Sequence, residues 1–509
     1  MARKEKKLEE ISCTYNEEDI DRREVGYYAT PEFISNYISL RMLQINNNGT
    51  KVLDPCCGKE ELLSFFFNKG LSIDGIDIIR YKDKYECNFE NINFINYYCN
   101  KKDSSISSLT HDDISDDEIL ELDYDYYIAN PPYNCHEVDF IKNNKGRLKK
   151  YFSDVGVHNM YSMFISAIID LAKQDAVIGL ITHDSFLTSK YHERLRKKIL
   201  NECTVHEVTM CSTDLFLSQG ADVRTSIIIL QKGNKHQGEV IVNNRSLNTE
   251  KLKDVLDKNI KKEYSKKYLL NDIILNNEKD NTEFIIECPD DIKSLFYEKR
   301  LGQILKCVTG ISTGNDKLYL SEKMEEPFII PFYKNPGKDR FYTNKYIYLH
   351  EDFMKFDKEI KNFMVRNKPL LFKAGITCSS MGVEFTASKL PSNSTFGVNA
   401  NIICDEYDSW WLLAYLNSTL VTYLVRGILI RSNMITSGYV SRIPIINLTK
   451  EEKERLIDLS KEAYELAANK KSINCVMLKI DNIVNMAAKI SKETIISINN
   501  FKDNLVKNT

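Results

Sequence analysis

Residues 126–133 of the chain read YYIANPPY, and this stretch decides how the first half of the molecule is expected to fold. The apolar run Tyr126–Ala129 has the length and composition of a buried strand. Asn130 follows at its carboxyl end, where the amide oxygen can accept one N–H of a planar amino group. The Pro131 carbonyl can accept the other N–H, because proline keeps the turn stiff, and Tyr133 can stack on the ring that carries the amine. The stretch therefore indicates a site that holds an amino group while its nitrogen attacks another reagent. A strand that merely ends in a proline turn is the alternative.

Other short apolar runs alternate with helical patterns on both sides of this stretch. Two of these runs end at Asp54 and Asp77, and later ones cover residues 176–181 and 225–231. Such alternation predicts the α/β class: a doubly wound, mostly parallel sheet with helices on both faces. Ligands of these sheets bind outside the carboxyl ends of the strands, so Asp54, Asp77 and Asn130 are expected to face one crevice.

The first of these strand ends continues into a tight loop, Asp54–Gly58, with the sequence DPCCG. Gly58 allows a ligand to approach the backbone closely. The Asp77 carboxylate can accept both hydroxyls of a ribose, and Asp112 or Asp113 can accept an exocyclic amine. Each signal is weak alone, since an Asp at a strand end is often only a helix cap. No phosphate-binding G-x-x-x-x-G-K-[ST] motif and no full G-x-G-x-x-G motif is present, which argues against a nucleoside triphosphate or a dinucleotide.

Composition narrows the class of protein further. The 509 residues, of which 43% are hydrophobic, predict more than one domain. We expect no membrane-spanning segment and no export signal, because no apolar run of about 20 residues occurs and the first residues are charged. The 13 cysteines form no C-x-x-C pair. This usage argues against a zinc site and against a disulfide framework, and it favours a cytoplasmic location.

The net charge of −3 does not by itself suggest a nucleic-acid partner, but charge is unevenly distributed. Residues 334–373 hold ten Lys or Arg against five Asp or Glu. A second basic stretch, Lys142–Lys150, follows the Asn130 motif in a polar segment that reads as a loop. Either stretch could contact a phosphate backbone, and an ordinary solvated surface is the alternative for both.

The order of these motifs resembles the S-adenosylmethionine-dependent amino-methyltransferases. Gly26–Pro31, with the sequence GYYATP, lies just before the first strand, a placement that resembles the gamma class of adenine-N6 DNA methyltransferases of restriction–modification systems. In that class this motif precedes the cofactor loop, the catalytic motif follows, and a target-recognition domain comes last. The resemblance covers roughly residues 22 to 232 well and the second half more loosely.

The resemblance implies roles for individual residues. Thr30 and the loop from Asp54 through Pro55 to Gly58 would hold the methionine moiety of S-adenosylmethionine. Asp77 would bind the ribose hydroxyls, and Ile78 would pack on the adenine ring of the cofactor. Asp113, or its neighbour Asp112, would accept the amine of that ring. No metal is implied.

The target adenine would be held by Asn130, Pro131, Pro132 and Tyr133, the four residues of the N-P-P-Y motif. Phe216 resembles the aromatic that packs on the other face of the flipped base, with a core phenylalanine as the alternative. One departure from the family pattern is Glu60, at a position where a second glycine is expected. A helix is predicted from about this residue to Lys69.

Four segments are expected. The resemblance implies an S-adenosylmethionine-binding catalytic domain at 1–232 and a mixed α/β target-recognition domain at 301–448. Lysine-rich, polar composition indicates a linker at 233–300, and helical periodicity predicts a helical tail at 449–509. The tail could be a helical cap, a dimer arm or a binding site for a partner. Double-stranded DNA is the expected partner, and a separate restriction endonuclease is a further candidate.

Three readings of function stay open. The first is sequence-specific methylation of adenine N6 in DNA. The second is methylation of a protein glutamine or of an RNA base, which also use an N-P-P-Y turn. The third is a DNA-binding subunit without activity, against which the intact Asn130 motif argues.

Overall fold

The chain folds as two compact units that divide between Glu287 and Cys288. The computed structural model describes residues 27–108, 122–133, 139–233, 238–264, 267–277, 280–382, 384–430 and 434–505. Three residues singled out by the resemblance, Gly26, Asp112 and Asp113, lie outside these ranges.

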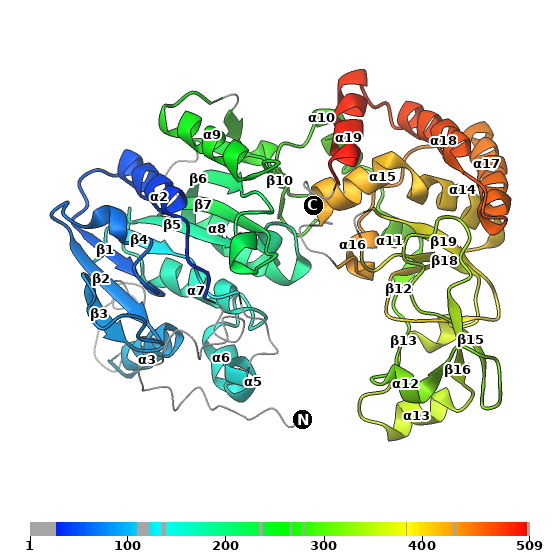
Figure 1. The fold of residues 1–509 in the computed structure, drawn as a ribbon, viewed down its shortest axis with the longest axis horizontal. Helices are drawn as coiled ribbons and strands as arrows, with labels where there is room; N and C mark the ends of the chain where they lie inside the picture. The colour runs from blue at the N-terminus through cyan, green and yellow to red at the C-terminus, as the bar shows by residue number, and fades with distance from the viewer. Residues whose placement is uncertain are drawn as a thin grey trace. The chain divides into compact units, whose positions relative to one another are not determined.

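A nine-stranded sheet forms the centre of the first unit (Figure 1). Its strand order is β3-β2-β1-β4-β5-β7-β6-β8-β9. The strands are β1 (Lys51–Asp54), β2 (Ser72–Asp77), β3 (Asn88–Asn91), β4 (Tyr126–Ala129), β5 (Val177–His183), β6 (Cys203–Met210), β7 (Thr225–Lys232), β8 (Glu239–Asn243) and β9 (Lys267–Leu269). A separate antiparallel pair joins β10 (Ile274–Leu275) to β11 (Glu283–Phe284).

The strands from β3 to β5 are all parallel, and β7 runs antiparallel between β5 and β6. From β1 the chain proceeds to β2 and β3 on one side, and then returns to place β4 and β5 on the other side. The strand order therefore reverses between β1 and β4, where sheets of this kind bind their ligands. The α/β class and the mostly parallel sheet predicted from the sequence are confirmed.

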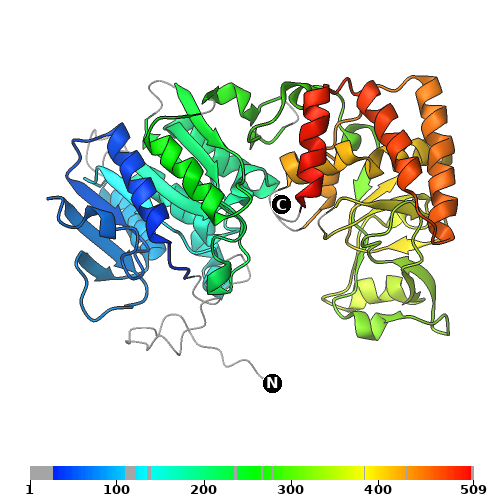
Figure 2. The same ribbon diagram turned by 45° about the horizontal axis from the view of Figure 1, so that its top comes forward.

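Helices cover both faces of this sheet, because alternate residues of each strand point to opposite sides. Tyr126 and Ile128 of β4 pack with α2 and α9, whereas Tyr127 and Ala129 pack with α3, α7 and α8. Figures 1 and 2 show α2 and α9 on the same face. The helices of this unit are α2 (Glu32–Ile45), α3 (Phe94–Ser108), α5 (Asp139–Asn143), α6 (Lys145–Tyr151), α7 (Met160–Leu171), α8 (Glu193–Glu202) and α9 (Thr249–Ile260).

Helix α2 is attached to the sheet by a close approach and a buried ion pair. A Cβ added to Gly179 of β5 would lie 2.5 Å from side-chain atoms of Ile38 and Met42, so glycine permits the contact. Arg41 Nε donates to Glu207 Oε2 over 2.9 Å, and both side chains are buried. The Tyr37 hydroxyl also donates to this carboxylate.

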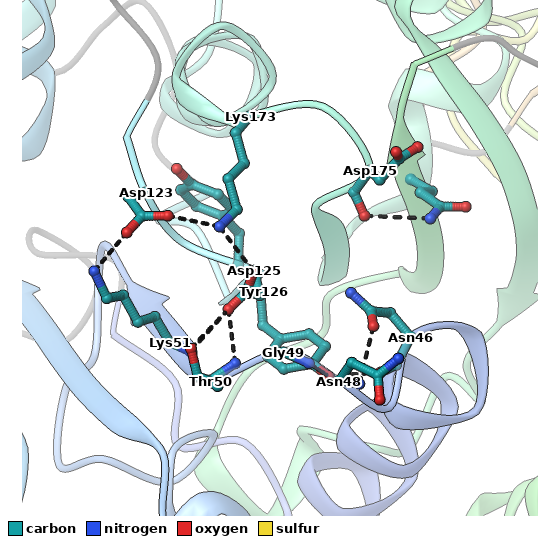
Figure 3. A network of polar contacts seen from close by, with 12 residues as sticks. Asn46, Asn48, Gly49, Thr50, Lys51, Asp123, Asp125, Tyr126, Lys173 and Asp175 are labelled. Carbon is teal, nitrogen blue, oxygen red and sulfur yellow. Dashed lines mark hydrogen bonds and ion pairs between the residues drawn. The ribbon is translucent and has the colours of Figure 1, made fainter.

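A polar network ties β1 to β4 at their amino ends, opposite the crevice (Figure 3). Asp125 Oδ2 accepts the backbone N–H groups of Thr50 (2.7 Å) and Lys51 (3.1 Å). Lys173 Nζ lies 2.8 Å from Asp125 Oδ1 and 2.7 Å from Asp123 Oδ1. Burial raises the pKa of Asp125, but these hydrogen bonds outweigh burial and the pKa is lowered overall. The network aligns the two strands whose other ends form the crevice.

Much of the predicted linker, residues 233–300, belongs instead to the first unit. Strand β8 pairs in parallel with β6, and β9 pairs with β8. Arg245 pairs with the buried carboxylate of Asp184 and also donates to the Cys211 carbonyl. Arg196, which is fully buried, donates to the carbonyls of Asn281 and Thr282. The prediction of a linker was based on the lysine-rich composition of the segment, and it missed the short apolar run at residues 240–242 that forms the buried part of β8.

The second unit contains small, mostly antiparallel sheets and a helical end. One four-stranded sheet has the order β12-β21-β18-β19, and another has the order β14-β16-β15-β20. The strands are β12 (Lys306–Val308), β13 (Ile311–Ser312), β14 (Leu320–Ser321), β15 (Phe328–Tyr333), β16 (Tyr346–His350), β17 (Met364–Val365), β18 (Gly375–Cys378), β19 (Ala387–Leu390), β20 (Thr395–Phe396) and β21 (Asn401–Ile403). The shorter helices are α10 (Asp290–Leu295), α11 (Leu301–Ile304), α12 (Asp316–Tyr319), α13 (Phe353–Glu359), α14 (Glu406–Asn417), α15 (Thr419–Tyr423) and α16 (Ser437–Val440).

The helical tail predicted at 449–509 is confirmed and consists of α17 (Lys450–Ala468), α18 (Asn474–Ala487) and α19 (Lys492–Asp503), seen as orange and red helices in Figure 2. Helix α17 packs on α14 of the same unit. Trp410 meets Tyr464 edge to face at 5.5 Å between ring centroids, and Lys453 Nζ lies 4.8 Å from the Trp411 ring centroid. These contacts attach α17 to the second unit, and the three roles considered for the tail stay predictions.

Within the described ranges, no single helix is both long and apolar enough to cross a bilayer. The consecutive segments Glu406–Asn417 and Thr419–Leu429 pass that test together by length and composition, and they are bent by 64° relative to each other.

Candidate active site

The carboxyl ends of β1, β2 and β4 open into one cavity with about 1000 Å³ of empty space, which includes solvent at its mouth. Asp54 ends β1, Asp77 ends β2, and Asn130 follows β4 directly. Because the three strands are parallel neighbours, their ends meet at the same edge of the sheet. Most of the site residues predicted from the sequence line this cavity: Thr30, Asp54, Pro55, Gly58, Asp77, Ile78, Asn130 and Pro132.

The orientation of the Asn130 amide is determined by its neighbours. Its Nδ2 donates to the Tyr28 carbonyl oxygen over 3.1 Å and to Thr30 Oγ1 over 3.0 Å. A carbonyl oxygen can only accept, so the atom that faces Tyr28 must be the nitrogen, and Oδ1 is on the opposite side. Oδ1 accepts a hydrogen bond from the Tyr133 hydroxyl and keeps a second lone pair. Thr30 therefore helps to orient Asn130 through a hydrogen bond. The sequence had predicted Thr30 only as a neighbour of the cofactor.

Three aromatic rings lie next to one another at this motif. The Tyr28 ring is nearly parallel to that of Tyr133, at 6.2 Å and 19°, and it lies 6.2 Å from the Phe216 ring at 56°. Tyr28 lines the cavity, whereas Phe216 is fully buried in the hydrophobic core and does not line it. The predicted stacking role of Phe216 is thus not supported by its position, because a base could reach its ring only after the surrounding packing opens.

The loop after Phe216 has a different part in the site. Gln219 Oε1 accepts the backbone N–H of Ala29 over 2.9 Å, and its Nε2 donates to the Ala29 carbonyl over 2.7 Å. This pair of bonds holds the segment that carries Tyr28 and Thr30. Gln219 was missed by sequence reasoning, because nothing local relates it to residues 190 positions earlier.

The DPCCG loop turns at Gly58 and again at Glu60. Gly58 has φ +53°, and a Cβ there would lie 2.6 Å from the Tyr27 ring, so no other residue fits without rearrangement. Glu60 also has a left-handed φ, +71°, which is the conformation that the glycine expected at this position would favour. Its buried carboxylate accepts the N–H groups of Glu86 (2.9 Å) and Cys87 (2.8 Å) and pairs with Lys82. The predicted helix at Glu60–Lys69 is wrong for this reason: the segment is a series of turns around η3 (Ser64–Phe66).

Three carboxyl groups line the cavity: Asp54, Glu61 and Asp77. Burial raises the pKa of Asp77 to about 6, and the hydrogen bonds from Ile79 and Gly58 oppose the increase. Burial, with a contribution from the nearby Asp77, raises the pKa of Asp54 well above its usual range. A ligand that bears positive charge would favour the ionised form of both carboxyl groups.

Several lining residues were not predicted. The Tyr27 hydroxyl donates to Glu61 Oε1, and the Tyr27 ring stacks on Tyr81 at 4.7 Å between centroids. Apolar side chains complete the wall: Leu62, Phe94, Phe140, Met160 and Phe164. Tyr27 carried a sequence signal, since it belongs to the GYYATP motif, but Glu61 and Tyr81 enter the cavity through long-range packing.

The basic stretch Lys142–Lys150, expected to be a loop, is largely helical in α5 and α6. Lys150 Nζ lies 3.0 Å from Asp103 Oδ1, and Arg147 donates to Asn96 and Asn100 on α3. Part of this positive charge is therefore engaged within the unit. In the described part of the chain, no three His, Cys, Asp or Glu side chains are grouped as a metal site.

The family model of the N-6 DNA methylases matches residues 15–300. The chain belongs to this family. The matched region contains the sheet, the cavity and the Asn130 motif, and it extends beyond β9, in agreement with the place of residues 239–269 in the first unit.

Among curated proteins, this N-6 DNA methylase is similar to two type II methyltransferases. It is 26% identical over 247 residues to M.BanIII of Aneurinibacillus aneurinilyticus, which covers 44% of this chain and 42% of that protein. It is 24% identical over 209 residues to M.BsuBI of Bacillus subtilis, which covers 36% of this chain and 39% of that protein. The matches thus span about two fifths of the relatives.

Solved structures of restriction–modification enzymes share the fold over most of the chain. The type IIL enzyme MmeI in complex with DNA gives a TM-score of 0.55 at 11% identity and covers 92% of this chain and 77% of that one. The DrdV–DNA complex gives 0.53 at 12% identity and covers 88% and 58%. At these identities the likeness concerns the fold alone.

Proposed function

We propose that the chain is a sequence-specific DNA methyltransferase of the gamma class that transfers a methyl group from S-adenosylmethionine to N6 of an adenine turned out of the duplex. One observation carries the proposal: Asn130 and Pro132 line the same cavity as Asp54, Gly58 and Asp77. Asn130, which is suited to accept from an amino group, therefore shares one space with the residues suited to a nucleoside cofactor. Membership of the N-6 DNA methylase family supports the same reaction.

The cavity suits S-adenosylmethionine in the chemistry of the side chains that line it. This cofactor carries a sulfonium and an ammonium group, which the carboxylates of Asp54 and Glu61 complement. Asp77 can accept the ribose hydroxyls while it holds the Gly58 N–H, and Ile78 can pack on the purine. When bound, S-adenosylmethionine supplies an electrophilic methyl group.

The protein's task is to position the amine of the target base. Asn130 Oδ1 and the Pro131 carbonyl accept hydrogen bonds from the two N–H groups of the amine. These bonds bias the amine nitrogen toward a tetrahedral shape and free its lone pair. Positioning of this kind supplies at most roughly 7–11 kcal/mol of the barrier. Extrusion of the base costs roughly a few kcal/mol, of which stacking on Tyr133 offsets about 1–3 kcal/mol.

Tyr28 is the second aromatic surface that we assign to the base. Its ring is nearly parallel to that of Tyr133 and lines the cavity, in contrast to Phe216. The two rings are 6.2 Å apart, so a base would enter between them after a small displacement of one ring.

Double-stranded DNA is the proposed partner of the chain, and the small sheets of residues 301–448 are its proposed target-recognition domain. A separate endonuclease as a partner and a cytoplasmic location stay predictions.

The decisive experiment is single-molecule sequencing of DNA from cells that express the full chain. We expect methyladenine at one short motif and none with Asn130→Ala, because that change removes an acceptor for the amine. Asn469→Ala, on an exposed helix end of the second unit, is the matched control and should methylate normally. Methylcytosine, or unmodified DNA together with methylglutamine in cellular protein, would contradict the proposal.

A further inference from the structure

His183 lies beside the proposed base site but has no part in the function described so far. His183 is the last residue of β5, and β5 pairs in parallel with β4. It therefore lies at the same edge of the sheet as Asn130. Its imidazole meets the Tyr133 ring nearly at right angles, at 6.2 Å between centroids and 81° between planes. Its side chain is about one quarter exposed, at 26%.

The tautomer of His183 follows from its contacts. Its Nδ1 accepts the backbone N–H of Ser185 over 3.1 Å, so this nitrogen carries no proton. Burial lowers the pKa of His183, and the neighbouring Asp184, 3.7 Å from Nδ1, only partly opposes the decrease. The ring is therefore neutral at pH 7 with its proton on Nε2, and Nε2 has no hydrogen-bond partner among the described residues.

The imidazole is held rigidly by a buried polar network. The Tyr161 ring stacks on it at 6.1 Å and 12°. The Tyr161 hydroxyl lies 2.7 Å from Ser185 Oγ and 2.7 Å from His192 Nε2. Ser185, which supplies the N–H to His183, is thus fixed by the residue that supports the ring. This leaves a donor with a defined direction and little conformational entropy to lose on binding.

A base in the proposed site needs such a donor. Its amino group is satisfied by Asn130 Oδ1 and the Pro131 carbonyl, but the ring nitrogens on either side of an adenine amine, N1 and N7, are acceptors that lose water on entry. The donors of the motif itself are engaged: both Nδ2 hydrogens of Asn130 bond to Tyr28 and Thr30, and the Tyr133 hydroxyl bonds to Asn130.

We propose that His183 contacts the target base and donates its Nε2–H to the ring nitrogen next to the amino group, N1 or N7 of the adenine. This rests on the proposed function and deepens it, since it gives the site a feature that recognises a heteroaromatic ring. The amide oxygen of a glutamine side chain takes the place of N1 relative to the amino group, but glutamine has no counterpart to N7. A contact from His183 to N7 would therefore favour a nucleobase over a protein amide.

The test uses duplexes that carry the recognition sequence found by sequencing, with adenine, 1-deazaadenine or 7-deazaadenine at the target position. For the wild-type chain, we expect kcat/KM to be at least tenfold lower on one deaza-analogue than on the other. On adenine, the kcat/KM of His183→Leu should be lower than that of the wild type by a similar factor. On the more weakly used analogue, the variant should lose no further activity from the missing nitrogen. His183→Gln, which can place an amide N–H near the Nε2 position, should recover part of the activity on adenine.

The comparison between enzymes removes the effect that a deaza-substitution has on the reactivity of the amine, because that effect is common to both. A fall by the same factor in wild type and in His183→Leu on every substrate would overturn the proposal. So would wild-type activity that does not distinguish the two analogues, a result that needs no variant to fold. Absence of DNA methylation by the wild type would instead reject the proposed function.

Discussion

Asn130 has its orientation from two neighbours that bind both hydrogens of its amide. Tyr28 offers a carbonyl, Thr30 a hydroxyl, and Gln219 holds the segment that carries them through a pair of hydrogen bonds to Ala29. An amide that could rotate would present its oxygen to the substrate only part of the time. The GYYATP motif thus orients the Asn130 amide and also forms part of the cavity wall.

The Tyr133 ring is expected to stabilise an extruded base. Tyr133→Ala should reduce kcat/KM more on a fully paired duplex than on one with a mismatch at the target, because stacking worth about 1–3 kcal/mol offsets extrusion only where the base must first be unpaired. Tyr133→Phe is the matched control: it loses the bond to Asn130 Oδ1 but keeps the ring, and should stay within about tenfold of wild type on both substrates. An equal loss for Tyr133→Ala on both would count against base extrusion.

Cofactor affinity should depend on pH through Asp77. Burial raises the pKa of this carboxyl to about 6, and ribose hydroxyls donate to its ionised form. Affinity for S-adenosylhomocysteine, measured by calorimetry, should therefore be full above pH 7 and fall by up to about tenfold near pH 5, where most of the carboxyl is protonated. Asp77→Asn should bind weakly at all pH values, whereas Asp74→Asn on the same strand should keep the wild-type profile. A wild-type profile that is flat between pH 5 and pH 7 would refute the role of Asp77.

The loop after β1 shows how one element tolerates an unfavourable residue. Glu60 stands in a left-handed conformation, which costs about 1–2 kcal/mol for a residue with a Cβ. Its carboxylate compensates, since it accepts two backbone N–H groups and pairs with Lys82. The contacts join the loop after β1 to the segment before β3.

Variants of Glu60 separate these two contributions. Glu60→Ala keeps the conformational cost and loses the contacts, so it should lower the free energy of unfolding by about 2–4 kcal/mol. Glu60→Gly also loses the contacts but relieves the conformation, and should be destabilised less. Glu60→Gln keeps an acceptor for the N–H groups and should lie nearest to wild type. Urea unfolding measures the order, and a Gly variant more stable than wild type would show that the carboxylate contributes little.

At the scale of the whole molecule, the division after Glu287 places residues 233–287 with the sheet. The buried ion pair between Arg245 and Asp184 joins this segment to the rest of the unit, and it matters because a lone buried carboxylate is costly. We propose that the independently folding catalytic unit ends near residue 287 and not at residue 232.

Two truncations test this boundary. A chain of residues 1–287 should unfold cooperatively and resist limited proteolysis. A chain of residues 1–232 should do neither, because it lacks β8, which pairs with β6, and leaves Asp184 without its partner. The unpaired buried carboxylate lowers the free energy of unfolding by roughly 3–5 kcal/mol. Arg245→Leu in the full chain is the companion variant and should be destabilised by a similar amount. Equal stability of the two truncations would reject the boundary.

The sequence by itself determined the class of the sheet, its strands β1, β2, β4, β5 and β7, and the motif residues Asp54, Gly58, Asp77 and Asn130. These are local features: apolar runs specify strands, and the chemistry follows each run directly. The tertiary structure alone decided that Glu60 takes the place of a glycine, that Phe216 is buried and that residues 239–269 extend the sheet. It also brought Gln219, Glu61 and His183 to the site. Each of these depends on which strands are neighbours and on contacts between residues far apart in the chain, and no local pattern of residues encodes that order.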